Sequence, residues 1–170
     1  EELLSNGMED GIVLDAVFAE SGQQVSDFWK IRESIPEAQK YEGASSKHDI
    51  SVPVSRVADF LVEAISDLEE MIPGIRPCAF GHVGDGNIHF NLSRPVDMSD
   101  DNFRLLESEI HKAVYDRTVA MGGSISAEHG IGRLRRDELE AYKAPVAMDV
   151  MRSIKATLDP NGIMNPGKVL

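Results

Sequence analysis

Two apolar, strand-like runs on either side of a glycine-rich turn constrain the fold of this chain more than any other feature. The runs cover residues 78–83 and 88–92, and the sequence Gly84-Asp85-Gly86-Asn87 separates them. An Asp-Gly pair between two such runs is a strong short-range signal for antiparallel pairing. The sequence therefore predicts a β-hairpin over residues 78–92.

The elements on both sides of this hairpin extend it into a larger unit. Residues 50–54 alternate between apolar and polar side chains, as in a half-buried strand, and residues 57–71 carry an apolar stripe at helical spacing. After the hairpin, a long helix is predicted from Ser99 to the pair Gly122-Gly123, followed by a short strand over residues 124–126. This order is that of a ferredoxin-like βαββαβ unit. The predicted fold class is therefore α+β, an antiparallel sheet with helices on one face plus terminal helical extensions.

Residues 1–48 are predicted to form an N-terminal part of the same domain. Residues 13–19 read as a short strand, and a helix is then expected to end near residue 35, where Pro36 interrupts the apolar spacing. Residues 39–46 are polar and aperiodic, which is typical of a loop or lid. A strand, a helix and a loop are therefore expected ahead of the core.

Residues 49–170 are predicted to hold the ferredoxin-like core and the C-terminal helices. Helical patterns return at about residues 132–142 and 146–158, before an irregular tail. Because the chain begins with Glu1 and not with Met, we expect it to be a piece of a longer protein.

Composition excludes several classes of partner. The formal net charge is −12, from 29 acidic against 17 basic residues, so binding to nucleic acid is not expected. No apolar stretch is long enough for a transmembrane helix, and the first residues lack the pattern of a signal peptide. The single cysteine, Cys78, is compatible with a reducing compartment, and a cytoplasmic location is expected.

The hairpin also brings two histidines together. A loop centred on the Asp-Gly pair places His82 directly opposite His89 and, in the same register, Phe80 opposite Asn91. Cross-strand partners on one face have Cβ atoms roughly 4.5 to 5.5 Å apart. Two imidazoles at this spacing can chelate one metal ion.

A third ligand and a base are predicted in the segment that follows the last strand. Glu128 and His129 lie between glycines, just before a helical pattern. Two histidines and one carboxylate leave a coordination position open, as in catalytic metal sites. Histidine is the side chain whose ordinary pKa lies closest to neutral pH, so His129 is then available as a general base.

Other interpretations of these residues remain open. The histidines could be structural in a non-catalytic assembly module, or the same His/His/Glu site could serve a metal-dependent hydrolase or lyase. From the residues alone, Arg32 is typical of a solvated helix face and Lys47 of the start of a strand.

Three motifs in order resemble the C-terminal domain of FAD-linked oxidases of the vanillyl-alcohol-oxidase type. Within that superfamily the chain is most similar to D-2-hydroxyglutarate and D-lactate dehydrogenases and to the flavin subunit of glycolate oxidase. The likeness runs from about Trp29 to the C-terminus. The motifs cover residues 81–91 (GHVGDGNIHFN), 123–132 (GSISAEHGIG) and 158–168 (LDPNGIMNPGK).

The resemblance implies roles for the site residues. It implies that His82, His89 and Glu128 hold a divalent metal, usually zinc, and that His129 removes the hydroxyl proton of a small D-2-hydroxy acid. It also implies that FAD receives the hydride, so that the acid is oxidised to the 2-oxo acid.

Further residues gain roles only through the resemblance. Arg32 and Lys47 match cations that bind substrate carboxylates, and Asn91 matches a polar substrate contact. Asn165 and Lys168 match a tail segment that returns to the flavin domain.

Two departures limit what the resemblance implies. D-2-hydroxyglutarate dehydrogenases tend to carry a threonine at the position of Pro36, so the D-2-hydroxy acid is left open between D-lactate, D-malate and others. The FAD-binding domain is absent from this chain, so the isolated domain is expected to be inactive and to partner its own FAD-binding domain. Apolar surface left uncovered makes a homodimer a further possibility.

Overall fold

The computed structural model describes residues 2–170 and divides the chain into two compact units between Tyr41 and Glu42. The first unit holds helix α1 (Glu2–Glu9) and helix α2 (Gly22–Ala38), and the short helix η1 (Gln39–Glu42) spans the division. All the strands of residues 2–170 lie in the second unit, which therefore carries the sheet and the residues arranged on it.

Two expectations for the first unit are wrong. Residues 13–19 form no strand, because no neighbouring segment pairs with their backbone groups. Helix α2 starts at the N-cap Ser21, whose hydroxyl accepts a hydrogen bond from the amide of Gln24, and continues past Pro36 to Ala38. Pro36 is tolerated because it lies in the last turn, where its ring removes a single main-chain hydrogen bond.

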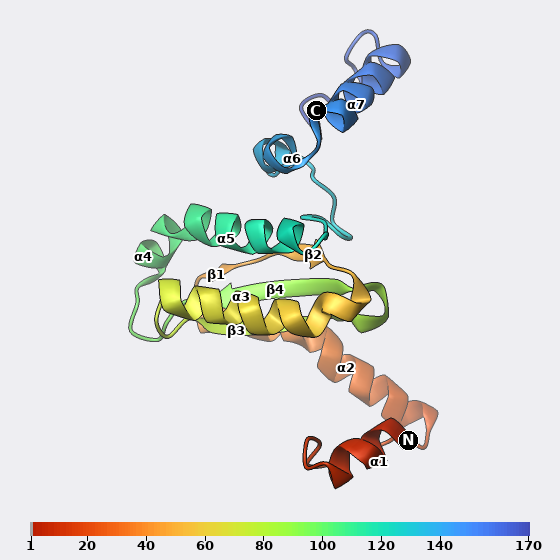
Figure 1. The fold of residues 1–170 in the computed structure, drawn as a ribbon, viewed down its shortest axis with the longest axis vertical. Coiled ribbons are helices and arrows are strands. Elements are labelled where there is room, and N and C mark those ends of the chain that lie inside the picture. Colours follow the sequence, from red (N-terminus) through yellow and green to blue (C-terminus); the bar gives the residue numbers. More distant parts are fainter. Residues whose placement is uncertain (1) are drawn as a thin grey trace. The chain divides into compact units, whose positions relative to one another are not determined.

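The sheet of the second unit is antiparallel and centred on one long strand. That strand, β4 (Asn87–Ser93), pairs with β3 (Arg76–His82) on one side and with β1 (Ser45–Ser46) and β2 (Asp49–Ser51) on the other (Figure 1). The short helix η2 (Val54–Arg56) follows β2. Because β4 has neighbours on both sides, it is the central strand, and its alternate side chains point to the two faces of the sheet.

The last predicted strand is reduced to a single bridge. Ser51 and Ser124 pair as an isolated antiparallel bridge, with main-chain hydrogen bonds in both directions, whereas residues 125 and 126 continue without pairing. The strands therefore lie side by side in the ferredoxin-like order. The last strand of that fold, predicted over residues 124–126, is reduced to Ser124. The α+β fold class is confirmed.

Two helices supply the apolar cover of the sheet. Helix α3 (Val57–Met71) and helix α5 (Glu107–Ala120) pack against each other, and α4 (Asp100–Leu105) precedes α5, so the long helix predicted from Ser99 is interrupted at Leu106. Their buried side chains join those of β2 and β4 in one core, which includes Ile50, Phe60, Leu68, Ile88, Phe90, Leu92, Ile110, Val114 and Tyr115. Since Ile88, Phe90 and Leu92 alternate along β4, the polar residues between them face the opposite side of the sheet.

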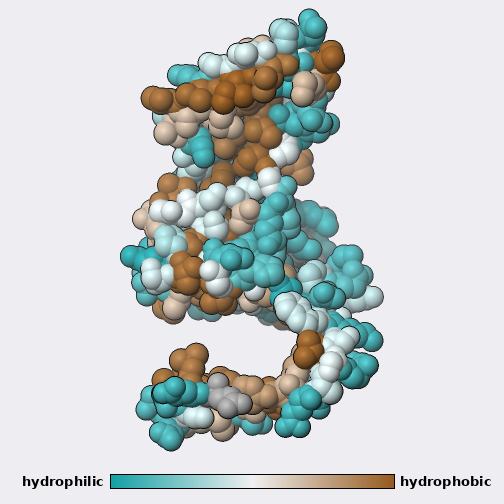
Figure 2. Space-filling view, turned by 90° about the vertical axis from the view of Figure 1, so that its right-hand side faces the viewer, coloured by the Kyte–Doolittle hydropathy of each residue, from teal (hydrophilic) through white to brown (hydrophobic). Residues whose placement is uncertain are grey.

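The chain ends in two further helices. Helix α6 (Arg136–Tyr142) and helix α7 (Pro145–Leu158) match the predicted helical patterns. The side chains of α7 at i, i+4 spacing are exposed and apolar, and Figure 2 shows a band of apolar surface at the end of the molecule that α7 occupies. Within residues 2–170, no helix has the length and apolar character to cross a membrane.

The hairpin is present, but its predicted register is wrong by two residues. His82 lies opposite Asn87 and Phe80 opposite His89, because the loop consists of η3 (Val83–Asp85) and Gly86. Gly86 has a φ of 69° and its carbonyl accepts a hydrogen bond from the amide of Val52, which fixes where the loop ends. A shift of two residues keeps every side chain on its predicted face.

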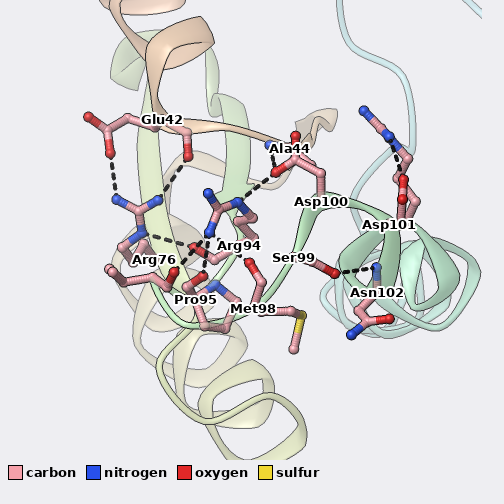
Figure 3. Close-up of polar contacts among 12 residues, drawn as sticks. Glu42, Ala44, Arg76, Arg94, Pro95, Met98, Ser99, Asp100, Asp101 and Asn102 are labelled. Atoms are coloured by element: carbon pink, nitrogen blue, oxygen red, sulfur yellow. Dashed lines mark hydrogen bonds and ion pairs between the residues drawn. The ribbon is translucent and has the colours of Figure 1, made fainter.

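Two arginines tie together the other end of the sheet, where β3 begins and β4 ends (Figure 3). Arg94 donates hydrogen bonds to the carbonyls of Pro95, Val96 and Met98 and to the carboxylate of Asp100. Arg76 donates to the carbonyl of Arg94 and to the Glu42 side chain and carbonyl. This network closes the turn after β4, at the end of the sheet opposite the hairpin loop.

Candidate metal and catalytic site

Three side chains that the sequence singled out meet at the loop end of the hairpin. His82 ends β3, His89 lies in β4, and Glu128 lies in the loop after the Ser51–Ser124 bridge. The Glu128 carboxylate lies between the two imidazoles, with Oε1 at 3.5 Å from His82 Nε2 and Oε2 at 3.4 Å from His89 Nε2. His82 and His89 are diagonal neighbours in the observed register and not directly opposite as predicted. They still lie on the same face of the hairpin.

The spacing of these atoms fits a divalent metal ion. A tetrahedral ion with ligands at 2.0–2.1 Å keeps its ligand atoms roughly 3.3 Å apart, close to the two nitrogen–oxygen distances to Glu128. Imidazole nitrogen and carboxylate oxygen are also the donors found at zinc sites with an open position. The donor types of His82, His89 and Glu128 therefore fit a divalent ion, while the donor atoms that lie within 4.8 Å of one another include those of His89 and Glu128 but not that of His82.

His129 lies directly beside this set. Its ring stacks on that of His89, with centroids 5.4 Å apart and an interplanar angle of 21°. Its Nδ1 is 3.9 Å from Asp49 Oδ2, and the side chain is 69% exposed. The imidazole can therefore meet a molecule that enters from solvent.

Asp49 belongs to the same cluster, and sequence reasoning missed it. Its Oδ2 accepts hydrogen bonds from three successive backbone amides, those of Ala127 (3.2 Å), Glu128 (2.8 Å) and His129 (2.7 Å). Burial raises the pKa of Asp49, but the hydrogen bonds from the His129 and Glu128 amides outweigh this effect and leave the pKa below its ordinary value. The one available signal was strand alternation, which turns Asp49 away from the core residue Ile50.

Donor atoms of Asp49, His89, Glu128 and His129 all lie within 4.8 Å of one another. His82 stands outside this group of four and joins the site through Glu128. The arrangement combines donor atoms of the kind that bind divalent metals with an exposed imidazole beside them.

The residues assigned to the substrate are divided between the two units. Arg32 lies on α2 in the first unit, whereas Lys47 is exposed between β1 and β2. Asn91 follows His89 on the same face of β4 but is buried opposite Cys78.

The two tail residues interact with each other. The Lys168 amide donates to the Asn165 carbonyl at 3.2 Å, and the next amide, that of Val169, donates to the carbonyl of Gly132. The tail is thereby attached to the segment just before α6.

His48, the residue before Asp49, faces the core. Its Nδ1 lies 2.8 Å from the Phe90 carbonyl and its Nε2 lies 2.7 Å from His111 Nδ1. Since a carbonyl only accepts, His48 donates from Nδ1 and accepts from His111 at Nε2. Desolvation, reinforced by the nearby His111, lowers the pKa of His48 to about 3. The His48 imidazole is therefore uncharged near neutral pH.

Comparison with known proteins assigns the chain to a family. The sequence matches the FAD linked oxidases, C-terminal domain, over residues 1–169. A D-2-hydroxyglutarate dehydrogenase of Stutzerimonas stutzeri is 43% identical over 162 residues, which are 95% of this chain and 35% of the relative. The mitochondrial D-2-hydroxyglutarate dehydrogenase of Arabidopsis thaliana is 40% identical over 170 residues, which are 100% of this chain and 29% of the relative.

The chain thus spans about a third of the length of these relatives. The family match covers almost every residue, and the motifs around His82, His89 and Glu128 lie within it. This chain belongs to the C-terminal domain family of FAD-linked oxidases.

Proposed function

We propose that this chain is the substrate- and metal-binding domain of an FAD-dependent D-2-hydroxy-acid dehydrogenase. The observation that carries the proposal is the Glu128 carboxylate placed between the Nε2 atoms of His82 and His89, with His129 stacked alongside. Relatives named D-2-hydroxyglutarate dehydrogenase support the reaction class.

In this proposal the four residues divide two tasks. A divalent ion, preferably zinc, is held by His82, His89 and Glu128. When bound, the ion supplies the positive charge that stabilises an alkoxide. His129 directs Nδ1 toward Asp49, so Nε2 is the nitrogen that takes the hydroxyl proton. FAD, when bound, accepts the hydride from the α-carbon.

The substrate is a D-2-hydroxy acid whose carboxylates are bound by Arg32 and Lys47, with Asn91 as a polar contact. Arginine suits bidentate binding of a carboxylate, whereas lysine acts as a point charge. D-2-Hydroxyglutarate is the first compound to test because of the relatives' names, and D-lactate is the comparison because Pro36 offers no hydroxyl to a distal carboxylate.

The partner is the protein's own FAD-binding domain. Residues 1–48 and 49–170 together form the cap over the flavin, Asn165 and Lys168 lie near it, and the chain alone does not turn over substrate. The exposed apolar side chains of α7 support a partner surface of this kind. We retain the cytoplasm as the proposed compartment, although the plant relatives are mitochondrial, and cell fractionation tests it.

The test is metal content of the purified chain beside a His82→Ala/His89→Ala double variant, both supplied with Zn²⁺ or Mn²⁺. We expect near-stoichiometric metal in the parent chain and loss of metal in the variant, measured by inductively coupled plasma mass spectrometry. Thermal unfolding of both proteins serves as the folding control. Equal metal in the two proteins would show that the histidines are structural.

Turnover distinguishes the proposed chemistry from its alternatives. The flavin-containing protein should reduce an artificial electron acceptor with a D-2-hydroxy acid, and the double variant should lose this activity by at least about a hundredfold. Hydrolysis or elimination by the chain alone, with Zn²⁺ and without flavin, would instead indicate a metal-dependent hydrolase or lyase.

A further inference from the structure

We propose that Asp49 is a positioning residue that fixes the Glu128–His129 dipeptide and orients the ring of His89 for metal binding. The inference rests on the proposed function, because it assigns Asp49 a task within that site. Asp49 itself does not bind the metal.

Hydrogen bonds from its surroundings occupy most of the acceptor sites of the Asp49 carboxylate. A carboxylate offers about four lone-pair sites. Oδ2 accepts from the amides of Ala127, Glu128 and His129, and Oδ1 accepts from the side-chain amide of Asn87 at 3.1 Å. With its side chain only 9% exposed, Asp49 is a buried anion neutralised by backbone amides.

The main chain of Asp49 holds the same loop. Its carbonyl accepts a hydrogen bond from the amide of Ala127 at 3.1 Å, and two residues further Ser51 pairs with Ser124. Side chain and backbone of β2 therefore hold one loop at both ends. The loop carries one proposed metal ligand and the proposed base side by side, so a displaced loop would misplace both.

Asp49 also faces the second ring nitrogen of His89. The two residues are ladder partners, and Asp49 Oδ1 lies 3.8 Å from His89 Nδ1 while Glu128 Oε2 lies 3.4 Å from His89 Nε2. A carboxylate on the Nδ1 side favours the proton there and leaves the Nε2 lone pair for a metal. Loss of such an outer partner typically weakens metal binding 10- to 100-fold.

Two variants separate the two tasks. Asp49→Asn keeps one oxygen for the three amides but removes the charge that faces His89, whereas Asp49→Ala removes both. The matched control is Asp100→Asn at the other end of the sheet, since Asp100 also accepts a backbone amide, that of Ala44, and pairs with an arginine. Thermal unfolding of each variant shows that it is folded.

Three measurements on the 170-residue chain test the proposal. Amide hydrogen exchange without metal should show the amides of Glu128 and His129 protected in the parent and in Asp49→Asn, and exposed in Asp49→Ala, whereas the Ala127 amide keeps its bond to the Asp49 carbonyl in all three proteins. Competition with a chromophoric chelator should show Zn²⁺ affinity lowered about 10-fold in Asp49→Asn and about 100-fold in Asp49→Ala, and unchanged in Asp100→Asn. In the Zn²⁺-loaded chain, ¹⁵N–¹H spectra should show the His89 proton on Nδ1 in the parent and a weakened Nδ1–H signal in Asp49→Asn.

The outcomes separate this inference from the proposed function. Equal Zn²⁺ affinity in the parent and in both Asp49 variants overturns the positioning role, while the metal site stands. If Asp49→Ala exposes the amides of Glu128 and His129 but the parent binds no Zn²⁺, Asp49 holds the loop as proposed and the metal site is wrong. If Asp49→Ala does not fold, Asp49→Asn decides through its Zn²⁺ affinity and its His89 signal.

Discussion

At the scale of single residues, the surroundings assign the histidines to different tasks. His48 and Asp49 are adjacent in sequence, but His48 contacts His111 in the core while Asp49 holds the loop of Glu128 and His129 on the other face. Alternation along an extended segment, which reverses the face at each residue, explains this difference.

The buried His48 gives the stability of the chain a predictable dependence on pH. Unfolded, the histidine takes a proton near its ordinary pKa of 6.5, whereas in the folded chain the pKa is about 3. Between these values the unfolded state binds more protons, so stability falls as the pH is lowered from about 6.5 toward 3. The neighbour His111 adds to the loss, because desolvation lowers its pKa as well.

The measurement is urea unfolding at pH 7, 6 and 5 for the parent chain and for His48→Gln. One proton per molecule corresponds to about 1.4 kcal/mol per pH unit, so the parent should lose on the order of 1 kcal/mol more than His48→Gln for each unit below pH 6. The groups that face the pair, Glu107 and Arg135, are unchanged in both proteins. Parallel stability curves for the two proteins would contradict this assignment.

At the scale of elements, the hairpin shows which structural features the local sequence pattern predicts and which it does not. The Asp-Gly turn and the two apolar runs identified both strands, and the face of each side chain was correct. The predicted register was wrong. The loop ends where the Gly86 carbonyl accepts a hydrogen bond from Val52, the residue after β2, and no local sequence pattern indicates that contact. The strand predicted over residues 124–126 was wrong for a similar reason, since only Ser124 pairs with β2.

Gly86 should therefore tolerate no side chain. A Cβ at this position would lie 1.9 Å from the Val52 carbonyl oxygen, and the φ of 69° is unfavourable for any other residue. We expect Gly86→Ala to lower the free energy of unfolding by about 2 kcal/mol or more, measured by urea titration. The control is Gly84→Ala in the same loop, where a Cβ meets nothing within 4 Å, and it should change stability by less than about 0.5 kcal/mol.

At the scale of the whole molecule, the order of elements was enough to predict the fold class. Periodicity identified α3, α5 and the hairpin, and a βαββαβ order admits few topologies. The candidate site was predicted in part: His82, His89 and Glu128 meet, but Asp49 stayed hidden because its partners lie 78 to 80 residues away. Contacts of that separation follow from the complete fold and not from any single motif.

The apolar side of α7 predicts how the chain behaves without a partner. Val146, Val150, Ile154 and Leu158 are each more than half exposed and recur at i, i+4 spacing. We expect the chain to self-associate at micromolar concentrations, and Val150→Lys/Ile154→Lys to shift it to the monomer in sedimentation velocity. Ser153→Lys/Thr157→Lys adds the same charge on polar exposed positions of α7 and should leave association unchanged. A parent chain that stays monomeric would contradict the expectation.

The attachment of the Glu128 loop to β2 has a consequence for protein synthesis. During translation the hairpin with both histidines leaves the ribosome first, and the carboxylate follows about forty residues later along the chain. A nascent chain that stops before the bridge at Ser124 would present two imidazoles but neither the acid nor the base of the loop. Metal loading in the correct geometry is therefore expected only after residues 124–129 have been made and have paired with β2, so that the ion is added after the hairpin has formed.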